Sequence, residues 1–128
     1  MEDLGQFYWG CLGTEIDGAD GTSIGTGLQN TLDIVSGCSE SPIAASEALA
    51  FEAEGYSDWY LPSRDELVEM YYTIGNGGPE GNIGGFSINL YWSSSENNNN
   101  LGWTGGPSGY LGGHLKDLLA DVRVIRAF

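Results

Sequence analysis

Glycine limits the possible folds of this chain more than any other feature, because it accounts for 21 of the 128 residues. That share is more than twice the usual ~7%, and the glycines follow no three-residue period of the collagen kind. Glycine gathers where a backbone turns sharply, and it weakens the interiors of helices and strands. The sequence therefore predicts a loop-rich fold of the α+β class rather than a bundle of helices.

Two segments carry the start and stop signals of helices. The first has Ser41 as its N-cap and Pro42 at its first helical position, and it stops before Gly55. The second opens with a capping box at Ser63–Glu66 and ends at Gly75. Apolar residues recur on one side of each segment, so both helices are expected to have structural roles.

The remaining segments predict a small twisted sheet with long connections. Residues 90–96 are typical of a central strand, and residues 122–128 have the β-branched density of a closing strand. Residues 5–37 are punctuated by glycine and predict turns with short extended pieces. Residues 75–89 predict a loop rich in glycine and asparagine, and residues 97–118 show no periodicity at all. No internal repeat is visible, so the whole chain is expected to form one domain.

Acidic residues dominate the chain, which has a formal net charge of −14. This charge disfavours nucleic acid and anionic membrane surfaces as partners. Residues 1–80 hold 15 acidic side chains and one basic side chain, whereas residues 81–128 hold three of each. The C-terminal part is therefore a neutral, aromatic and amide-rich patch that suits a partner selected by shape and hydrogen bonding. The alternative is that the acids only solubilise the rest of the molecule.

Targeting signals are missing from the residues at hand. No apolar run reaches the length of a membrane span, and Met1–Leu4 lack the basic and apolar regions of a signal peptide. Membrane insertion is therefore not expected. The chain is either not secreted on a signal of its own or a module taken from a larger protein.

Residues that commonly carry catalysis or bind metals are scarce. Cys11 and Cys38 lie outside any CxxC motif, and their spacing fits a disulfide and a pair of buried thiols equally well. His114 is the only histidine and lacks the partners of a hydrolytic triad. Asp17 and Asp20 are a weak calcium candidate, because the alternation of an EF-hand loop is missing and a tight turn explains them better. No active site, metal site or cofactor is expected.

Several stretches of the chain match, in order and spacing, the segments of one known family. They are Trp9–Thr14, Gly18–Thr22, Gly25–Gly27, Asn30–Val35, Gly55–Leu67, Gly84–Phe86, Tyr91–Glu96 and Val122–Phe128. Over nearly its whole length the chain resembles the domain of unknown function also found at the C-terminus of the Legionella collagen-like adhesin. The resemblance implies a C-type-lectin-like fold with two helices on a small twisted antiparallel sheet. Only Met1–Tyr8 precede the Trp-Gly-Cys segment, where the family has a glycine-rich strand, so the partner of the closing strand stays open.

Family members of this kind include the variable proteins of diversity-generating retroelements. In these systems an Asn-rich template is copied with errors at adenines, and the altered residues occupy the ligand-binding face. Changing the first two bases of an Asn codon, AAY, gives NNY, which never encodes Lys, Glu, Gln, Met or Trp. These five types occur 17 times in residues 1–96 and only twice in residues 97–121, as Trp103 and Lys116. Both resemble family positions that flank the variable ones.

The resemblance places a variable, ligand-binding part at about residues 91–121 and a closing strand at about 122–128. The side chains expected to be exposed and to meet the ligand are Asn97, Asn98, Asn99, Asn100, Leu101, Thr104, Pro107, Ser108, Tyr110, Leu111, His114, Leu115, Asp117 and Leu118. Tyrosine, serine, glycine and asparagine suit such a face, because they combine contact area with adaptable hydrogen bonding.

A buried frame is expected to hold these side chains in place. Its residues are Trp59, Trp92, Ser93, Ser94, Ser95, Trp103, Arg123 and Arg126. The serine hydroxyls should be hydrogen bonded, and Glu96 should pair with Arg123 or Arg126, because a buried charge or hydroxyl needs a partner.

The expected function is recognition of a protein or glycan target through this diversified face. The setting would be a virion or a prokaryotic cell surface, with a display partner or fused anchor. One alternative is an invariant lectin or adhesin domain in which Asn97–Asn100 form a disordered loop, and another is a purely structural surface component. Formylglycine-generating oxidases share the general fold, but they use a cysteine pair in the C-terminal part of the chain. Both cysteines here lie in residues 11–38, so catalysis is not expected.

Overall fold

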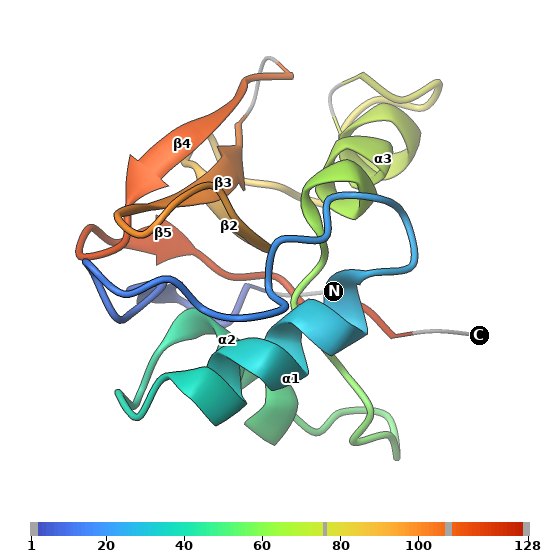
Figure 1. The fold of residues 1–128 in the computed structure, drawn as a ribbon. Helices are drawn as coiled ribbons and strands as arrows, with labels where there is room; N and C mark the ends of the chain where they lie inside the picture. Colours follow the sequence, from blue (N-terminus) through green and yellow to red (C-terminus); the bar gives the residue numbers. More distant parts are fainter. Residues whose placement is uncertain (1–2, 76, 107–108, 127–128) are drawn as a thin grey trace.

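The computed structural model describes residues 3–75, 77–106 and 109–126 (Figure 1). In these residues the helices are α1 (Gly27–Gly37), α2 (Ala44–Ala50) and α3 (Arg64–Ile74). The strands are β1 (Gln6–Phe7), β2 (Tyr91–Glu96), β3 (Leu101–Gly105), β4 (Leu111–Leu115) and β5 (Ala120–Asp121). The α+β class is therefore confirmed, although the described residues form three helices and not two.

The five strands form one mixed sheet in the order β1-β5-β2-β3-β4. Strand β2 lies at its centre, as the sequence predicts, and pairs with β3 in an antiparallel register that is interrupted between Trp92 and Glu96. The expectation of a purely antiparallel sheet is wrong, because β2 and β5 run parallel with Tyr91 opposite Asp121. Strand β1 pairs with β5, which identifies the partner that the sequence left open.

Helices cover both faces of the sheet (Figure 1). Neighbouring side chains of a strand point to opposite faces, and Tyr91 and Trp92 accordingly belong to different apolar clusters. Trp92 packs in the main core with residues of α1 and α2 such as Ile34, whereas Tyr91 packs with Leu67 and Met70 of α3. The sheet therefore separates a large core on one side from a small one under α3.

Helix α1 (Gly27–Gly37) was not expected, because residues 5–37 predict turns and short extended pieces. Its buried side carries Asn30, Thr31 and Ile34, while Leu28 and Leu32 are exposed. Thr31 Oγ1 lies 2.7 Å from the Gly27 carbonyl and 3.2 Å from that of Leu61, and Asn30 Nδ2 donates to Gly21 at 2.6 Å. The helix therefore packs through satisfied polar groups, and a search for apolar periodicity overlooks it.

The other two helices were expected, one with a shifted start. Helix α2 begins at Ala44 rather than at Pro42, because the Ser46 hydroxyl accepts from the Ile43 N–H at 2.9 Å and the Ile43 carbonyl accepts the first helical bond. Helix α3 begins after the predicted capping box, in which the Ser63 N–H donates to Glu66 Oε1 at 2.8 Å. It ends before Gly75, as predicted.

The C-terminal part is more regular than the sequence indicates. Residues 97–118 contain β3 and β4, which form a fully paired hairpin from Leu101↔Leu115 to Gly105↔Leu111. The closing strand, in contrast, was placed too late. Strand β5 is Ala120–Asp121. Beyond it, Val122 exchanges backbone hydrogen bonds with Leu4 and Gly5, and Ile125 forms a bridge with Tyr60. Residues 127 and 128 lie outside the described part.

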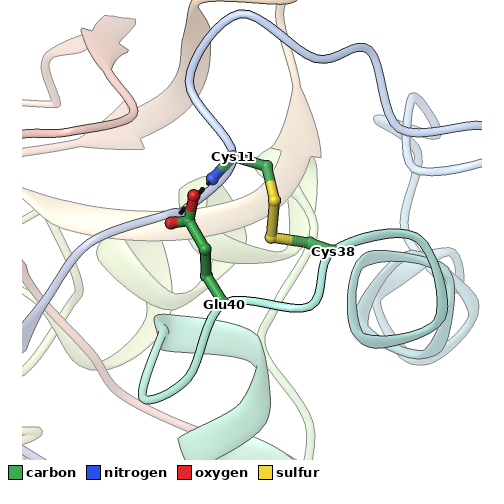
Figure 2. A group of neighbouring side chains, drawn as sticks. All are labelled: Cys11, Cys38 and Glu40. Carbon is green, nitrogen blue, oxygen red and sulfur yellow. Dashed lines mark hydrogen bonds between the residues drawn. A yellow bond between two sulfur atoms is a disulfide. The ribbon is translucent and has the colours of Figure 1, made fainter.

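Cys11 and Cys38 form a disulfide, which decides between the two states that their spacing allowed. It ties the N-terminal loop to the residue after α1. Figure 2 shows Glu40 beside it, where the carboxylate accepts a hydrogen bond of 3.1 Å from the Cys11 N–H. These three residues come close enough together to hold a metal ion, but the paired sulfurs offer no thiolate.

Removing this disulfide should lower the free energy of unfolding. We expect a loss of about 2–4 kcal/mol in the Cys11→Ser/Cys38→Ser variant, because the bridge closes a loop in the unfolded chain. Urea denaturation of the variant and the oxidised protein measures the difference. Glu40→Gln is the control, and it should change stability by no more than about 1 kcal/mol, since it keeps the disulfide. Equal stability of the double variant and the oxidised protein would contradict the expectation.

Candidate functional site

The candidate ligand-binding residues gather along β4, the strand at one edge of the sheet. At one end of β4, the turn of Asn97–Asn100 lies against the turn that follows the strand, because the Lys116 N–H donates to the Asn100 carbonyl at 3.0 Å. At the other end, Tyr110 leads into Leu111. We call the exposed side chains of this region the edge surface: Asn97, Asn98, Asn99, Asn100, Tyr110, Leu111, Leu115, Asp117 and Leu118.

These nine exposed residues are most of the fourteen candidates. Leu101 and His114 are half-buried, and Pro107 and Ser108 lie outside the described residues. Leu111, Leu115 and Leu118 are 37%, 43% and 44% exposed, and side chains outside the site such as Ile88 are exposed more. Apolar exposure alone therefore does not mark the site, and its significance depends on the residues lying together.

Thr104 was expected at the ligand and is instead fully buried. Its side chain is on the opposite face of the hairpin from Leu111, and its hydroxyl donates to the Gly112 carbonyl at 3.0 Å. His114 shares that inner face, with its ring centroid 5.2 Å from the Trp92 ring. Strand alternation, which the glycines of this segment conceal, therefore removes Thr104 from the site.

Not every asparagine of the turn is free to act on a ligand. The Asn98 Oδ1 accepts hydrogen bonds from the N–H groups of Asn100 at 2.8 Å and Leu101 at 3.0 Å. The Asn99 carbonyl accepts from the Gly13 N–H at 2.8 Å. The turn is therefore an ordered part of the fold, and Asn98 has a structural role within it.

The serine strand beneath the site agrees with the prediction. Trp92, Ser93, Ser94 and Ser95 are each completely buried. The Ser93 hydroxyl donates to the Trp103 carbonyl at 2.8 Å, and that of Ser95 donates to the Gly21 carbonyl at 2.6 Å. Among the described residues, each buried side-chain nitrogen and oxygen has a hydrogen-bond partner. Trp59 is also buried as expected, whereas Trp103 is only half-buried, with Arg64 stacked 5.0 Å from its ring.

Glu96 pairs with Lys116 and not with either arginine, which corrects the predicted frame. Lys116 Nζ lies 2.7 Å from Glu96 Oε2 and 2.9 Å from the Thr14 carbonyl, with both side chains almost wholly buried. The same carboxylate oxygen accepts from the Ile16 N–H at 2.9 Å, and the ammonium lies 4.5 Å from the centre of the Trp9 ring. This buried pair holds both turns of the edge surface against the N-terminal loop.

The two arginines have carboxylate partners elsewhere. Arg123 lies 2.6 Å from Asp3 and stacks on Phe86 at 4.2 Å. Arg126 binds Asp58 through two hydrogen bonds of 2.8 and 3.0 Å. These bonds hold the pKa of the Asp58 carboxyl below its ordinary value and raise the pKa of Arg126.

The weak calcium candidate gains no support. Asp17 and Asp20 are exposed, and neither is part of a cluster with metal-binding geometry among the described residues.

A cavity beside the edge surface escaped prediction from the sequence. It lies between α3 and the outer face of β2, β3 and β4, and its volume is about 250 Å³. Its lining, which we call the tyrosine pocket, consists of Leu67, Val68, Tyr71, Tyr72, Gly75, Phe86, Ser87, Tyr91, Gly105, Gly106, Gly109, Tyr110 and Leu111. The adjacent Tyr71 and Tyr72, of which the second is exposed, were the only available signal, since a helix with a structural role alone seldom needs two.

Tyr91 lies in the wall of the pocket, and its side chain is buried. Burial raises the pKa of this phenol above its ordinary value of about 10. Its hydroxyl donates to Asp3 Oδ2 at 2.8 Å and accepts from the Ser87 N–H at 2.8 Å.

This raised pKa should appear as a loss of stability at high pH. A group whose pKa is higher in the folded state stabilises the fold below its unfolded pKa, and the contribution is lost as the pH rises through the folded pKa. We expect Tyr91→Phe to lose less stability than the parent protein between pH 9 and about 11, measured by urea denaturation. Part of the loss of stability with rising pH should remain in Tyr91→Phe, because burial raises the pKa of Tyr60 too. Tyr72→Phe is the exposed control, and an unchanged slope in Tyr91→Phe would contradict the prediction.

Exposed positions of the edge surface should tolerate replacement. We expect Asn99→Ala, Tyr110→Ala and Leu118→Ala to change the free energy of unfolding by about 0.5 kcal/mol or less each. Thr104→Val should cost about 1–3 kcal/mol, because it leaves the Gly112 carbonyl without its donor. Urea denaturation tests all four, and a loss of several kcal/mol in Tyr110→Ala would place that residue in the core.

Comparisons with known proteins leave the function open. The chain matches no protein-family model, and a search of the curated proteins finds no match. Within the described residues, none of the helices is both long and apolar enough to cross a membrane.

Proposed function

We propose that this protein binds a protein or glycan target through the edge surface, and that a diversity-generating retroelement varies the residues of that surface. A C-type-lectin-like fold would carry the surface, and binding would be non-covalent, without a cofactor and without catalysis. Display on a virion or a prokaryotic cell surface would bring it to its target.

One observation carries the proposal. Nine of the twelve described candidate positions are exposed, and they lie together along β4 and the turns at its ends. The described residues of segment 97–121 that do not fit variation are the buried ones, Gly102, Thr104, Lys116, Ala120 and Asp121. A random side chain at a buried position would leave a cavity, an overpacked contact or an unpaired polar group. Diversification needs this division between a free surface and a fixed support.

Two glycines of the segment, Gly102 and Gly112, differ in how well they should tolerate a side chain. A Cβ added at Gly102 would lie 2.7 Å from the Trp9 ring, and one at Gly112 would lie 2.3 Å from the Tyr110 hydroxyl. Gly102 faces a buried ring that cannot move aside, so we expect it to stay constant. Gly112 meets an exposed ring that can shift, so the constraint there is weaker.

The genomic neighbourhood tests the proposal directly. We expect a reverse transcriptase gene near the locus and a near-copy of the codons for residues 90–128. Mismatches between the two copies should fall at adenines, in codons of the edge surface, and should spare Gly102, Thr104 and Lys116. A locus without the near-copy, or identical residues at the edge surface across independent isolates, would replace this proposal with an invariant lectin or adhesin domain.

A further inference from the structure

The tyrosine pocket has a size and lining that select its occupant. A cavity of ~150 Å³ in another protein holds benzene, so about 250 Å³ accommodates a group of one or two rings. Tyr71, Tyr72 and Tyr110 contribute aromatic side chains to its lining. Aromatic rings prefer offset or edge-to-face contact with one another, and Tyr71 and Tyr72 already meet at 85°.

Among the polar side chains of the pocket, Ser87 and Tyr91 are already engaged, which leaves only the hydroxyls of Tyr71, Tyr72 and Tyr110 for a sugar. Ser87 donates its hydroxyl to Asp121 at 2.7 Å, and its N–H donates to the Tyr91 hydroxyl. A sugar site needs several convergent polar groups free to bind its hydroxyls. The remaining lining is aliphatic, aromatic or glycine.

A cationic ligand is also disfavoured. No lining side chain is charged, and the guanidinium of Arg123 lies 4.2 Å from the Phe86 ring and 5.9 Å from the Tyr91 ring. This buried cation already covers the Phe86 ring, and its positive charge repels a second cation beside it. A neutral ring is therefore the group that fits.

The position of the pocket points to a polypeptide. Its exposed lining residues are Tyr72, Gly109, Tyr110 and Leu111, and the last two also belong to the edge surface. Leu111 begins β4, and among the described strands only β3 pairs with β4. The outer edge of β4 therefore offers unpaired N–H and C=O groups, which an extended peptide backbone satisfies and a small aromatic compound does not.

We infer that the tyrosine pocket receives an aromatic side chain of a polypeptide partner whose backbone lies along the outer edge of β4. The inference rests on the proposed function and narrows its target from protein or glycan to protein. Most of the pocket wall comes from α3 and the loops before β2, outside the variable segment. A constant anchor would thus accompany a surface whose other contacts change.

Titration of the ¹⁵N-labelled full chain with N-acetyl-L-tryptophanamide tests the pocket. We expect chemical-shift changes at the amides of Gly75, Gly105 and Gly106, with N-acetyl-L-leucinamide binding about fivefold more weakly, the factor that one aromatic pair contributes. Tyr72→Ala should weaken tryptophanamide binding by a similar factor. Tyr8→Ala, an exposed tyrosine outside the pocket, is the matched control and should bind as the parent protein does.

A blocking variant covers the case in which Tyr72→Ala fails to fold. Val68→Trp places an indole in the pocket from the half-buried face of α3 and should abolish binding of the probe. Shift changes away from the pocket, equal binding of the two amides, or binding that survives Val68→Trp would overturn the inference.

A short peptide distinguishes the two possible sources of the aromatic ring, a polypeptide side chain and a small aromatic compound. We expect acetyl-Ser-Thr-Trp-Thr-Ser-amide to bind about tenfold more tightly than the tryptophanamide, because its backbone adds hydrogen bonds to β4. Shift changes should then extend over Leu111–Leu115. Tighter binding of free indole than of the peptide would identify a small aromatic compound and overturn the choice of a polypeptide.

The two proposals can fail separately. The probe reports on the pocket whether or not the locus holds a retroelement. If the pocket does not bind the probe but the locus is variable, only this inference is refuted. A pocket that binds the probe beside an invariant locus would refute only the diversification.

Discussion

Replacing Lys116 with methionine should lower the free energy of unfolding by about 3–5 kcal/mol, the usual cost of removing one partner from a buried ion pair. The variant leaves the Glu96 carboxylate buried with only the Ile16 N–H as a donor, and it removes the donor of the Thr14 carbonyl. Urea denaturation at neutral pH measures the loss.

A double variant tests whether the loss of stability comes from the charge that is left buried without a partner. Glu96→Gln/Lys116→Met removes both charges, and it should be more stable than Lys116→Met alone, because no uncompensated charge stays buried. Asp65→Asn breaks the partly exposed pair with Arg64 and should cost about 1 kcal/mol or less. If Lys116→Met costs no more than Asp65→Asn, the buried pair is not holding the two turns in place.

Trp92→Ala is the second substitution with a large expected effect, about 3–5 kcal/mol. The indole is completely buried in the main core, and its Nε1 donates to the Phe7 carbonyl at 2.7 Å. Removing it leaves a cavity between the sheet and the helices and one unpaired carbonyl.

Trp92→Phe distinguishes these two losses. It keeps much of the ring volume and loses the hydrogen bond, so we expect a smaller cost of about 1–3 kcal/mol. Thermal or urea unfolding of both variants gives the comparison. Equal losses in the two would mean that the hydrogen bond, and not the packing of the ring, accounts for the contribution of Trp92.

Local signals explain which elements were predictable. Helix α3 has its capping box and its terminal glycine within a dozen residues of sequence, and β2 has a run of aromatic and small residues that stays buried throughout. Helix α1 buries Asn30 and Thr31, whose partners Gly21 and Leu61 belong to other segments. No periodicity in the sequence records such distant partners, so this helix was missed.

The candidate site was predictable in its position and less so in its details. The hairpin was hidden because glycines occupy many of its strand positions, as in Leu111–Leu115, and they obscure the alternation that excludes Thr104. The partner of Glu96 was missed because lysine is rarely buried completely, yet Lys116 is. The tyrosine pocket depends on α3 approaching β3 at Gly105, where a Cβ would lie 3.0 Å from Leu67. Only the folded chain shows that contact.

The place of β5 in the sheet has a consequence for the order of folding. Strand β5 lies between β1 and β2, so Gln6 and Asp121 must meet before the sheet is complete. Hairpin β3–β4 closes a short loop and can form within microseconds, whereas pairing the distant ends of the chain costs more loop entropy and comes later. The hairpin, which carries Tyr110, Leu111 and Leu115 of the edge surface, is thus the local event, and β1, β5 and the N-terminal loop are added to it. Substitutions on the outer side of β4 therefore affect a hairpin that forms before the rest of the sheet.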